Sequence, residues 1–329
     1  MLHTLDQPAR TVHRDPVDYP PVLALARWRR EGQRGALLTV VGIEGTSPRP
    51  LGAQIAVSEG GDVCGYFSGG CLEDELSLVA RSAVREGANM FHRYGQGSPF
   101  IDIRLPCGSG IDVYFDQSIT DVLLFEMEAL LLAREPFVLG TDLMTGASQV
   151  LLAGPARTRE IGRRGDIFHN LVQPALQVHV YGTGYGAVQL AKLVNSLGQH
   201  VSLFASDELT TNAAAVYGLD AELISMDAAN LAPADAWTAT ALMFHDHDRE
   251  LPIFRHVLNG PSFYIGAVGS RRVQEQRLKA LERDGFMPQH LARIIGPAGN
   301  VQGARSATEL AVGIYSEILE TARAKNLVT

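Results

Sequence analysis

The sequence predicts an α/β protein with an N-terminal mixed α+β domain over residues 1–170 and a C-terminal parallel-sheet domain over 171–329. The chain has 329 residues, which is about two domains at roughly 150 residues each. The second half alternates strand patterns with helix patterns, and this alternation is typical of a parallel sheet with helices on both faces. The first half lacks that alternation, so we expect a different architecture there.

The first half mixes strand patterns with one strongly amphipathic helix. A stripe of apolar residues predicts a helix over about 72–87, with Glu73 on its opposite, polar face. Two of the expected strands form a hairpin with Cys107 at its tip. Apolar runs bounded by glycine and proline predict strands at 36–43, 53–57, 100–105 and 111–115.

The second half begins with a buried-strand pattern at 176–182 that leads directly into a helix at 185–197. Its last helix starts after Ser306, which forms a capping-box pattern with Glu309. Between these, strands are expected at 200–205, 221–225, 238–244 and 263–268, and helices at 250–258 and 271–285.

Composition excludes several classes of protein. There are 36 acidic and 28 basic side chains, a net charge of −8, whereas a nonspecific nucleic-acid binder is basic. Three cysteines, an odd number, argue against a secreted disulfide framework. The first ten residues lack the basic start and apolar run of a signal peptide, and no uncharged stretch resembles a membrane span. We therefore expect a cytoplasmic protein with neither nucleic acid nor membrane as partner.

The turn GTGYGA follows the 176–182 strand and has the G-x-G-x-x-A spacing of a Rossmann-like domain. Gly182 makes the turn and Gly184 allows close approach of a pyrophosphate at the start of the helix. The acid expected after the second strand is missing, because Ser206 stands there and Asp207 comes late. Nucleotide binding and a purely structural role both remain open.

A glycine pair, Gly69 and Gly70, delivers Cys71 to the first turn of the predicted helix. The helix dipole and free N–H groups favour the thiolate there, and the glycines permit a backbone nest for an oxyanion. The alternative is a small buried residue at a crowded junction. We expect a functional thiol at Cys71, whereas Cys64 lies within a strand pattern and is expected in the core.

Three further patterns suggest anion or metal sites. Arg49 follows a serine and a proline in a glycine-bounded loop, which suits an anion clamp, or a surface ion pair. Arg271 and Arg272 lie where a strand runs into a helix, another place for an anion. The histidine–aspartate cluster at 245–248 resembles a metal site, but adjacent loop residues rarely converge on one ion.

Together these motifs resemble the xanthine dehydrogenase accessory factor (XdhC/CoxI) family. The resemblance lies in GTSPRPLG (45–52), GGCLE (69–73), Cys107-Gly108, the 182–187 turn, YIGAVGSRR (264–272), GPAG (296–299) and ATELAV (307–312). It covers most of the chain in order. The chain departs from the family's usual Cys-Gly-Gly at Ser109, and Phe244 stands where the family commonly has threonine.

The resemblance implies a chaperone that binds molybdenum cofactor and favours a non-enzymatic accessory role, although an enzymatic activity stays open. It also implies support of cofactor sulfuration with a cysteine desulfurase and insertion into a xanthine dehydrogenase-type molybdoenzyme. We expect Cys71 and Cys107 to contact the molybdenum, and Arg49 with the glycine loops to hold the phosphate of the cofactor. Gly69, Gly70 and Glu73 belong to the same expected site, and the active form is expected to be a homodimer.

Two other functions stay open. The 182–187 turn also fits an NAD(P)-dependent oxidoreductase, for which His245 and His247 are the candidate acids. A cysteine hydrolase would place Cys71 beside a histidine base such as His92. Under the chaperone hypothesis, Cys71, Arg49 and Gly184 are expected to border one cleft.

Overall fold

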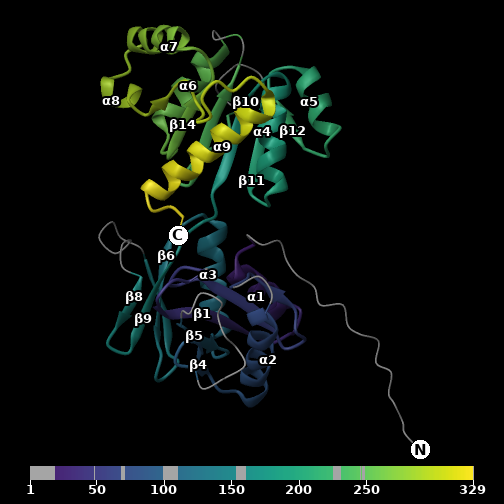
Figure 1. Cartoon of the computed structure of the whole chain (residues 1–329), viewed down its shortest axis with the longest axis vertical. Helices are drawn as coiled ribbons and strands as arrows, with labels where there is room; N and C mark the ends of the chain where they lie inside the picture. Colours follow the sequence, from purple (N-terminus) through teal and green to yellow (C-terminus); the bar gives the residue numbers. More distant parts are fainter. Residues whose placement is uncertain are drawn as a thin grey trace, which may run out of the picture. The chain divides into compact units, whose positions relative to one another are not determined.

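The computed structural model describes residues 19–47, 49–67, 71–98, 110–152, 161–224, 231–244, 246 and 249–328. The chain forms two compact units, Met1–Pro174 and Ala175–Thr329, which the sequence colours separate in Figure 1. Antiparallel sheets build the first unit and a parallel sheet builds the second, which confirms the predicted fold class. Among the described residues, no helix is long and apolar enough to cross a membrane.

The first unit has two antiparallel sheets, in the strand orders β3-β2-β1-β5-β4 and β7-β6-β9-β8. Its elements are α1 (Pro21–Arg30), β1 (Gly35–Glu44), β2 (Gln54–Ser58), β3 (Val63–Cys64), α2 (Cys71–Glu86), β4 (Met90–Gly95), β5 (Gly110–Asp116), α3 (Asp121–Leu132), β6 (Phe137–Asp142), β7 (Ser148–Leu152), β8 (Gly162–Arg164) and β9 (Ile167–Val172).

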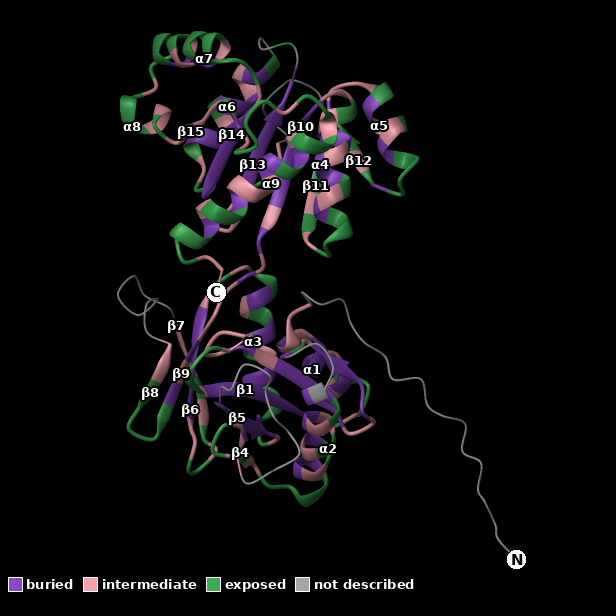
Figure 2. Ribbon diagram, viewed as in Figure 1, coloured by how far each residue is buried: buried purple, intermediate pink, exposed green. Residues whose placement is uncertain are grey.

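The five-stranded sheet buries both of its faces (Figure 2). Successive strand residues point to opposite faces, so Leu38 packs with Phe115 under Leu76 of α2, while Leu37 packs with Phe137 and the helices α1 and α3. α2 therefore has its first turn fixed against a rigid sheet. Cys64 is fully buried in β3, which confirms its predicted place in the core.

The second unit is a six-stranded parallel sheet in the order β12-β11-β10-β13-β14-β15. Buried residues of α4, α5 and α9 pack on one face, and those of α6 and α7 on the other. Its elements are β10 (Gln177–Gly182), α4 (Gly184–Ser196), β11 (His200–Ala205), α5 (Glu208–Ala215), β12 (Ala221–Leu223), β13 (Thr238–Met243), α6 (Glu250–Asn259), β14 (Tyr264–Ala267), α7 (Arg271–Arg283), α8 (Pro288–Leu291), β15 (Ile294–Ile295) and α9 (Ala307–Ala324).

The strand order reverses between β10 and β13, because the chain builds β11 and β12 to one side and then β13 to β15 to the other. Such a reversal opens a crevice at the carboxyl ends of the strands, where ligands of open α/β sheets bind. The capping box predicted at Ser306 and Glu309 is confirmed, and it starts α9.

Residues 100–105, the first strand of the predicted hairpin with 111–115, lie outside the described residues. The described part of β5 pairs with β1 along one edge and, over residues 110–115, with β4 along the other. Described strands therefore occupy both hydrogen-bonding edges of β5. The sequence pattern of β4 was missed because its polar His92 and Arg93 interrupt the apolar alternation.

Candidate cofactor-binding site

Cys71 is the first residue of α2, which confirms that it lies in the first helical turn. A group at this position is close to the unpaired N–H groups and the positive end of the helix dipole. The Cys71 side chain and residues 68–70, which include Gly69 and Gly70, lie outside the described part of the structure. The anion nest predicted at the glycine pair therefore stays a prediction.

The sequence pattern predicts Glu73 on the polar face of α2, and this prediction is wrong. Its side chain is buried, with 6% of the residue exposed, and its Oε1 accepts the backbone N–H of Phe67 at 2.8 Å. Phe67 is itself fully buried. Glu73 is the third residue of α2, so one carboxylate ties the start of the helix to the chain six residues earlier.

Arg49 lies beside the segment that leads into α2. Its guanidinium carbon is 4.5 Å from the centre of the Tyr66 ring, a cation–π contact. Its backbone N–H donates to Ser47 Oγ at 3.3 Å. Its Nε is buried and has no hydrogen-bond partner among the described residues. The structure thus brings Arg49 against Tyr66, which lies five positions before Cys71 in the chain.

The loop that carries Arg49 is held at its far end. Gly52 has φ +84°, and its carbonyl accepts a hydrogen bond from the Asn170 side chain at 3.0 Å. A Cβ at Gly52 would lie 2.3 Å from Asn170 Oδ1, so only glycine fits. This explains the glycine at the end of the GTSPRPLG motif.

Tyr66 is the residue of this site that sequence reasoning missed. It is 36% exposed and supports the Arg49 guanidinium with its ring. The available signal was an aromatic residue shortly before a glycine pair, which by itself indicates a core side chain as readily as a platform.

Cys107 and its neighbours from 99 to 109 lie outside the described residues, so whether Cys107 approaches Cys71 stays a prediction. His92, the candidate base of a cysteine hydrolase, packs its ring 5.5 Å from that of Phe115. Burial lowers the pKa of His92, although the Glu75 carboxylate opposes that shift. A neutral imidazole there fits the sheet core as well as catalysis.

In the second unit, the 182–187 turn starts α4 as predicted, with Thr183 as its N-cap. A Cβ at Gly182 would lie 2.5 Å from Met243 O, so this glycine is required by the close approach of β13. The Gly184 N–H donates to Thr210 Oγ1 at 2.7 Å. Thr210 is buried and is held in turn by Asp207, the acid that comes late in the sequence.

Arg271 and Arg272 are the first two residues of α7, exposed at the carboxyl edge of the same sheet as Gly184. The first turn of α7 holds no acidic residue. Two cations at the positive end of a helix dipole are unfavourable unless an anion lies near them. Their role as anion ligands stays a prediction.

The histidine–aspartate cluster is described only at Asp246, which is exposed and faces Arg249 at 3.6 Å. His245 and His247 lie outside the described residues. In the part of the chain that the structure describes, no group of three or more histidine, cysteine, aspartate or glutamate residues could hold a metal ion.

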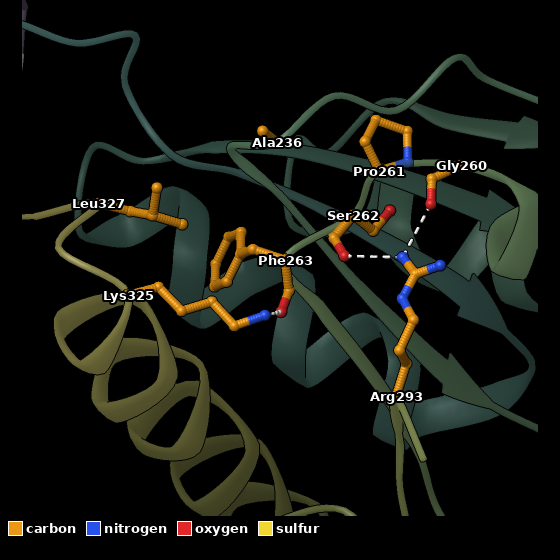
Figure 3. A pocket seen from close by; sticks show the side chains of 8 residues that line it. All are labelled: Ala236, Gly260, Pro261, Ser262, Phe263, Arg293, Lys325 and Leu327. Atoms are coloured by element: carbon orange, nitrogen blue, oxygen red, sulfur yellow. Dashed lines mark hydrogen bonds between the residues drawn. The ribbon is translucent and has the colours of Figure 1, made fainter. Parts of the chain in front are cut away.

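A cavity of about 400 Å³ lies at the opposite, amino edge of the second sheet (Figure 3). Its two cations are both bound to backbone carbonyls. Arg293 donates to the carbonyls of Leu258 and Gly260 at 2.7 Å each, and Lys325 donates to that of Phe263 at 2.6 Å. Arg293 stabilises the terminal carbonyls of α6 and Lys325 binds the carbonyl just before β14, so both cations of this cavity have a structural role.

Comparison with known proteins covers both units. The family model "XdhC and CoxI family" matches residues 28–95, and the model "XdhC Rossmann domain" matches residues 178–318. The chain is 32% identical over 288 residues to the molybdenum cofactor insertion chaperone PaoD of Escherichia coli (strain K12), covering 87% of this chain and 83% of PaoD.

A solved structure described as a xanthine dehydrogenase from Bacillus halodurans superposes with a TM-score of 0.73. It covers 93% of this chain and 97% of that one at 19% sequence identity. At that identity the likeness concerns the fold.

Proposed function

Because the chain belongs to the XdhC and CoxI family, we propose that it is a molybdenum cofactor chaperone. It binds the cofactor as cargo, supports its sulfuration together with a cysteine desulfurase, and inserts it into a xanthine dehydrogenase-type molybdoenzyme. It works in the cytoplasm as a homodimer. The observation that carries the proposal is the 32% identity to a molybdenum cofactor insertion chaperone over 87% of the chain.

The residues around Cys71 suit this cargo. Molybdenum favours soft thiolate ligands, and Cys71 at the first residue of α2 is placed where a thiolate is stabilised. The cofactor carries a phosphate, and the buried Nε of Arg49 is a donor that lacks a partner among the described residues. We assign binding of the phosphate to Arg49 and binding of the molybdenum to Cys71 and Cys107. Gly69, Gly70 and Glu73 shape the segment that carries Cys71.

A carrier must also release its cargo. A few protein side chains, supplied by two loops and the start of one helix, hold the cofactor less permanently than a closed site with four protein ligands on the metal would. Sulfuration and transfer both require that the molybdenum remain reachable while the phosphate is held. An arginine for the phosphate and thiols for the metal separate these two tasks.

The second unit contributes a nucleotide-binding crevice in this proposal. Gly182 and Gly184 lie at the carboxyl end of β10, beside the reversal of strand order, and Arg271 and Arg272 follow β14 at the same edge of the sheet. The crevice is a binding site for a phosphorylated ligand in this proposal.

Cofactor retention tests the proposal. Purified protein is incubated with molybdenum cofactor, freed of unbound material, and assayed for bound molybdenum and pterin. We expect Arg49→Ala and the double variant Cys71→Ala, Cys107→Ala to retain at least tenfold less cofactor than wild type. Cys64→Ala, which removes the buried thiol of β3, is the matched control and should retain the wild-type amount. Equal retention by the double variant would show that the thiols do not hold the cofactor.

Insertion and sulfuration are tested separately. Loaded chaperone is mixed with a cofactor-free xanthine dehydrogenase-type enzyme, with and without a cysteine desulfurase and its cysteine substrate. We expect enzyme activity to appear faster than with free cofactor, and to be highest when the desulfurase is present during loading. No gain from the desulfurase would remove the sulfuration role and leave the carrier role intact.

A further inference from the structure

Arg249 of the second unit contacts the segment after β11. It lies between β13 and α6, and its Nη1 donates to Ser206 Oγ, directly after β11, at 3.2 Å. β10 lies between β11 and β13 in the sheet. The contact therefore joins the connections that follow the two neighbours of β10, whose own chain turns at Gly182 to Gly184. That turn is where a dinucleotide would bind.

Ser206 occupies the position of the acid that selects an unphosphorylated ribose. In dinucleotide sites a carboxylate after the second strand binds the free ribose hydroxyl, and an arginine accommodates a phosphate at that place. Ser206 is half-buried here. The next carboxylate, Asp207, is used within the protein, because it accepts the N–H and the hydroxyl of Thr210 at 2.8 and 2.9 Å.

The donors of the Arg249–Ser206 pair suit a phosphate. Since Ser206 Oγ accepts from Arg249, its own hydroxyl hydrogen is free to donate to a phosphate oxygen. The guanidinium has five N–H donors, and 46% of the Arg249 side chain is exposed. Asp246 faces its Nε at 3.6 Å but is 64% exposed and beyond hydrogen-bonding distance, so it can turn into solvent.

We propose that this crevice selects a nucleotide whose ribose carries a phosphate monoester, as NADP(H) does, over one with a free diol, such as NAD(H). The inference rests on the proposed nucleotide binding by the second unit. Arg249 and Ser206 determine this specificity, and Arg271 and Arg272 hold the remaining phosphates. The selected group is therefore recognised by charge and by a hydroxyl donor, both supplied after strands that flank β10.

The test compares NADPH and NADH titrated into the full-length protein and followed by nicotinamide fluorescence. Wild type should bind NADPH at least tenfold more tightly than NADH. Arg249→Ala should weaken NADPH about tenfold and leave NADH unchanged, and Ser206→Asp should reverse the preference. Arg283→Ala is the matched control, since it removes an exposed arginine at the far end of α7 and should change neither affinity.

The outcomes separate this inference from the function on which it rests. Equal affinity for the two dinucleotides, or an unchanged ratio in Ser206→Asp, overturns the phosphate selectivity and leaves nucleotide binding in place. No saturable binding of either dinucleotide overturns both. Cofactor retention is measured on the same variants in parallel, so that a change in dinucleotide affinity is separated from a change in cofactor binding.

Discussion

Replacing Glu73 by alanine should destabilise the first unit. The substitution leaves the N–H of Phe67 without its acceptor, and Phe67 is 0% exposed, so water cannot replace the carboxylate easily. A buried donor without a partner costs about 1–3 kcal/mol, and the lost charge at the start of α2 adds about 0.3–1 kcal/mol. We expect a total near 2 kcal/mol.

The assay is urea unfolding followed by tryptophan fluorescence. The chain has two tryptophans: Trp28 is buried in the first unit and Trp237 lies in the second. In a Trp237→Phe background, Trp28 reports on the first unit alone. With an m-value of about 2 kcal/mol/M, a loss of about 2 kcal/mol lowers the urea midpoint by about 1 M.

Two variants sharpen the comparison. Glu73→Gln keeps an acceptor for the Phe67 N–H and should lose less than half as much stability. Asp74→Ala removes the adjacent, exposed carboxylate of the same helical turn and should cost at most about 0.5 kcal/mol. If Glu73→Ala unfolds within about 0.2 M of wild type, the carboxylate does not tie the chain as we infer.

Three further predictions concern other parts of the molecule. In the structure the Arg277 guanidinium lies 2.8 Å from the buried Glu250 carboxylate, and Arg277→Met removes this ion pair. The free energy of unfolding of the second unit, measured with urea, should fall by about 3–5 kcal/mol, and adding Glu250→Leu should recover most of that loss. Gly52→Ala places a Cβ 2.3 Å from Asn170 Oδ1 on a residue with φ +84°, so it should lower both the urea midpoint and the cofactor retention. Cofactor retention at the wild-type level would show that the Arg49 loop tolerates the change. Burial holds the pKa of His92 in the folded protein below its usual 6.5, so the unfolded chain takes up a proton that the folded one does not as pH falls below about 6.5. The free energy of unfolding should therefore decrease from pH 7.5 to 5.5, and His92→Gln should reduce that decrease. An identical dependence of the free energy of unfolding on pH in both proteins would contradict the assignment.

Local patterns in the sequence were enough to predict much of the fold. The strand–helix alternation of the second half, the capping box at Ser306 and the start of α2 at Cys71 were all predicted and are all present. Each depends on residues within a few positions of one another, whose spacing and capping chemistry act through the adjacent backbone. The glycine at position 182 was also identified, although the close approach that requires it is to β13, about 60 residues later.

The sequence by itself therefore determined the fold class and the family, and it offered candidate site residues, because periodicity and motif spacing are local properties. Tertiary structure alone decided which of those residues meet. β5 pairs with β4, Glu73 is buried against Phe67, Arg49 lies on Tyr66, and Arg249 reaches Ser206. These contacts join segments whose proximity follows from sheet order and packing, and a one-dimensional pattern does not specify either.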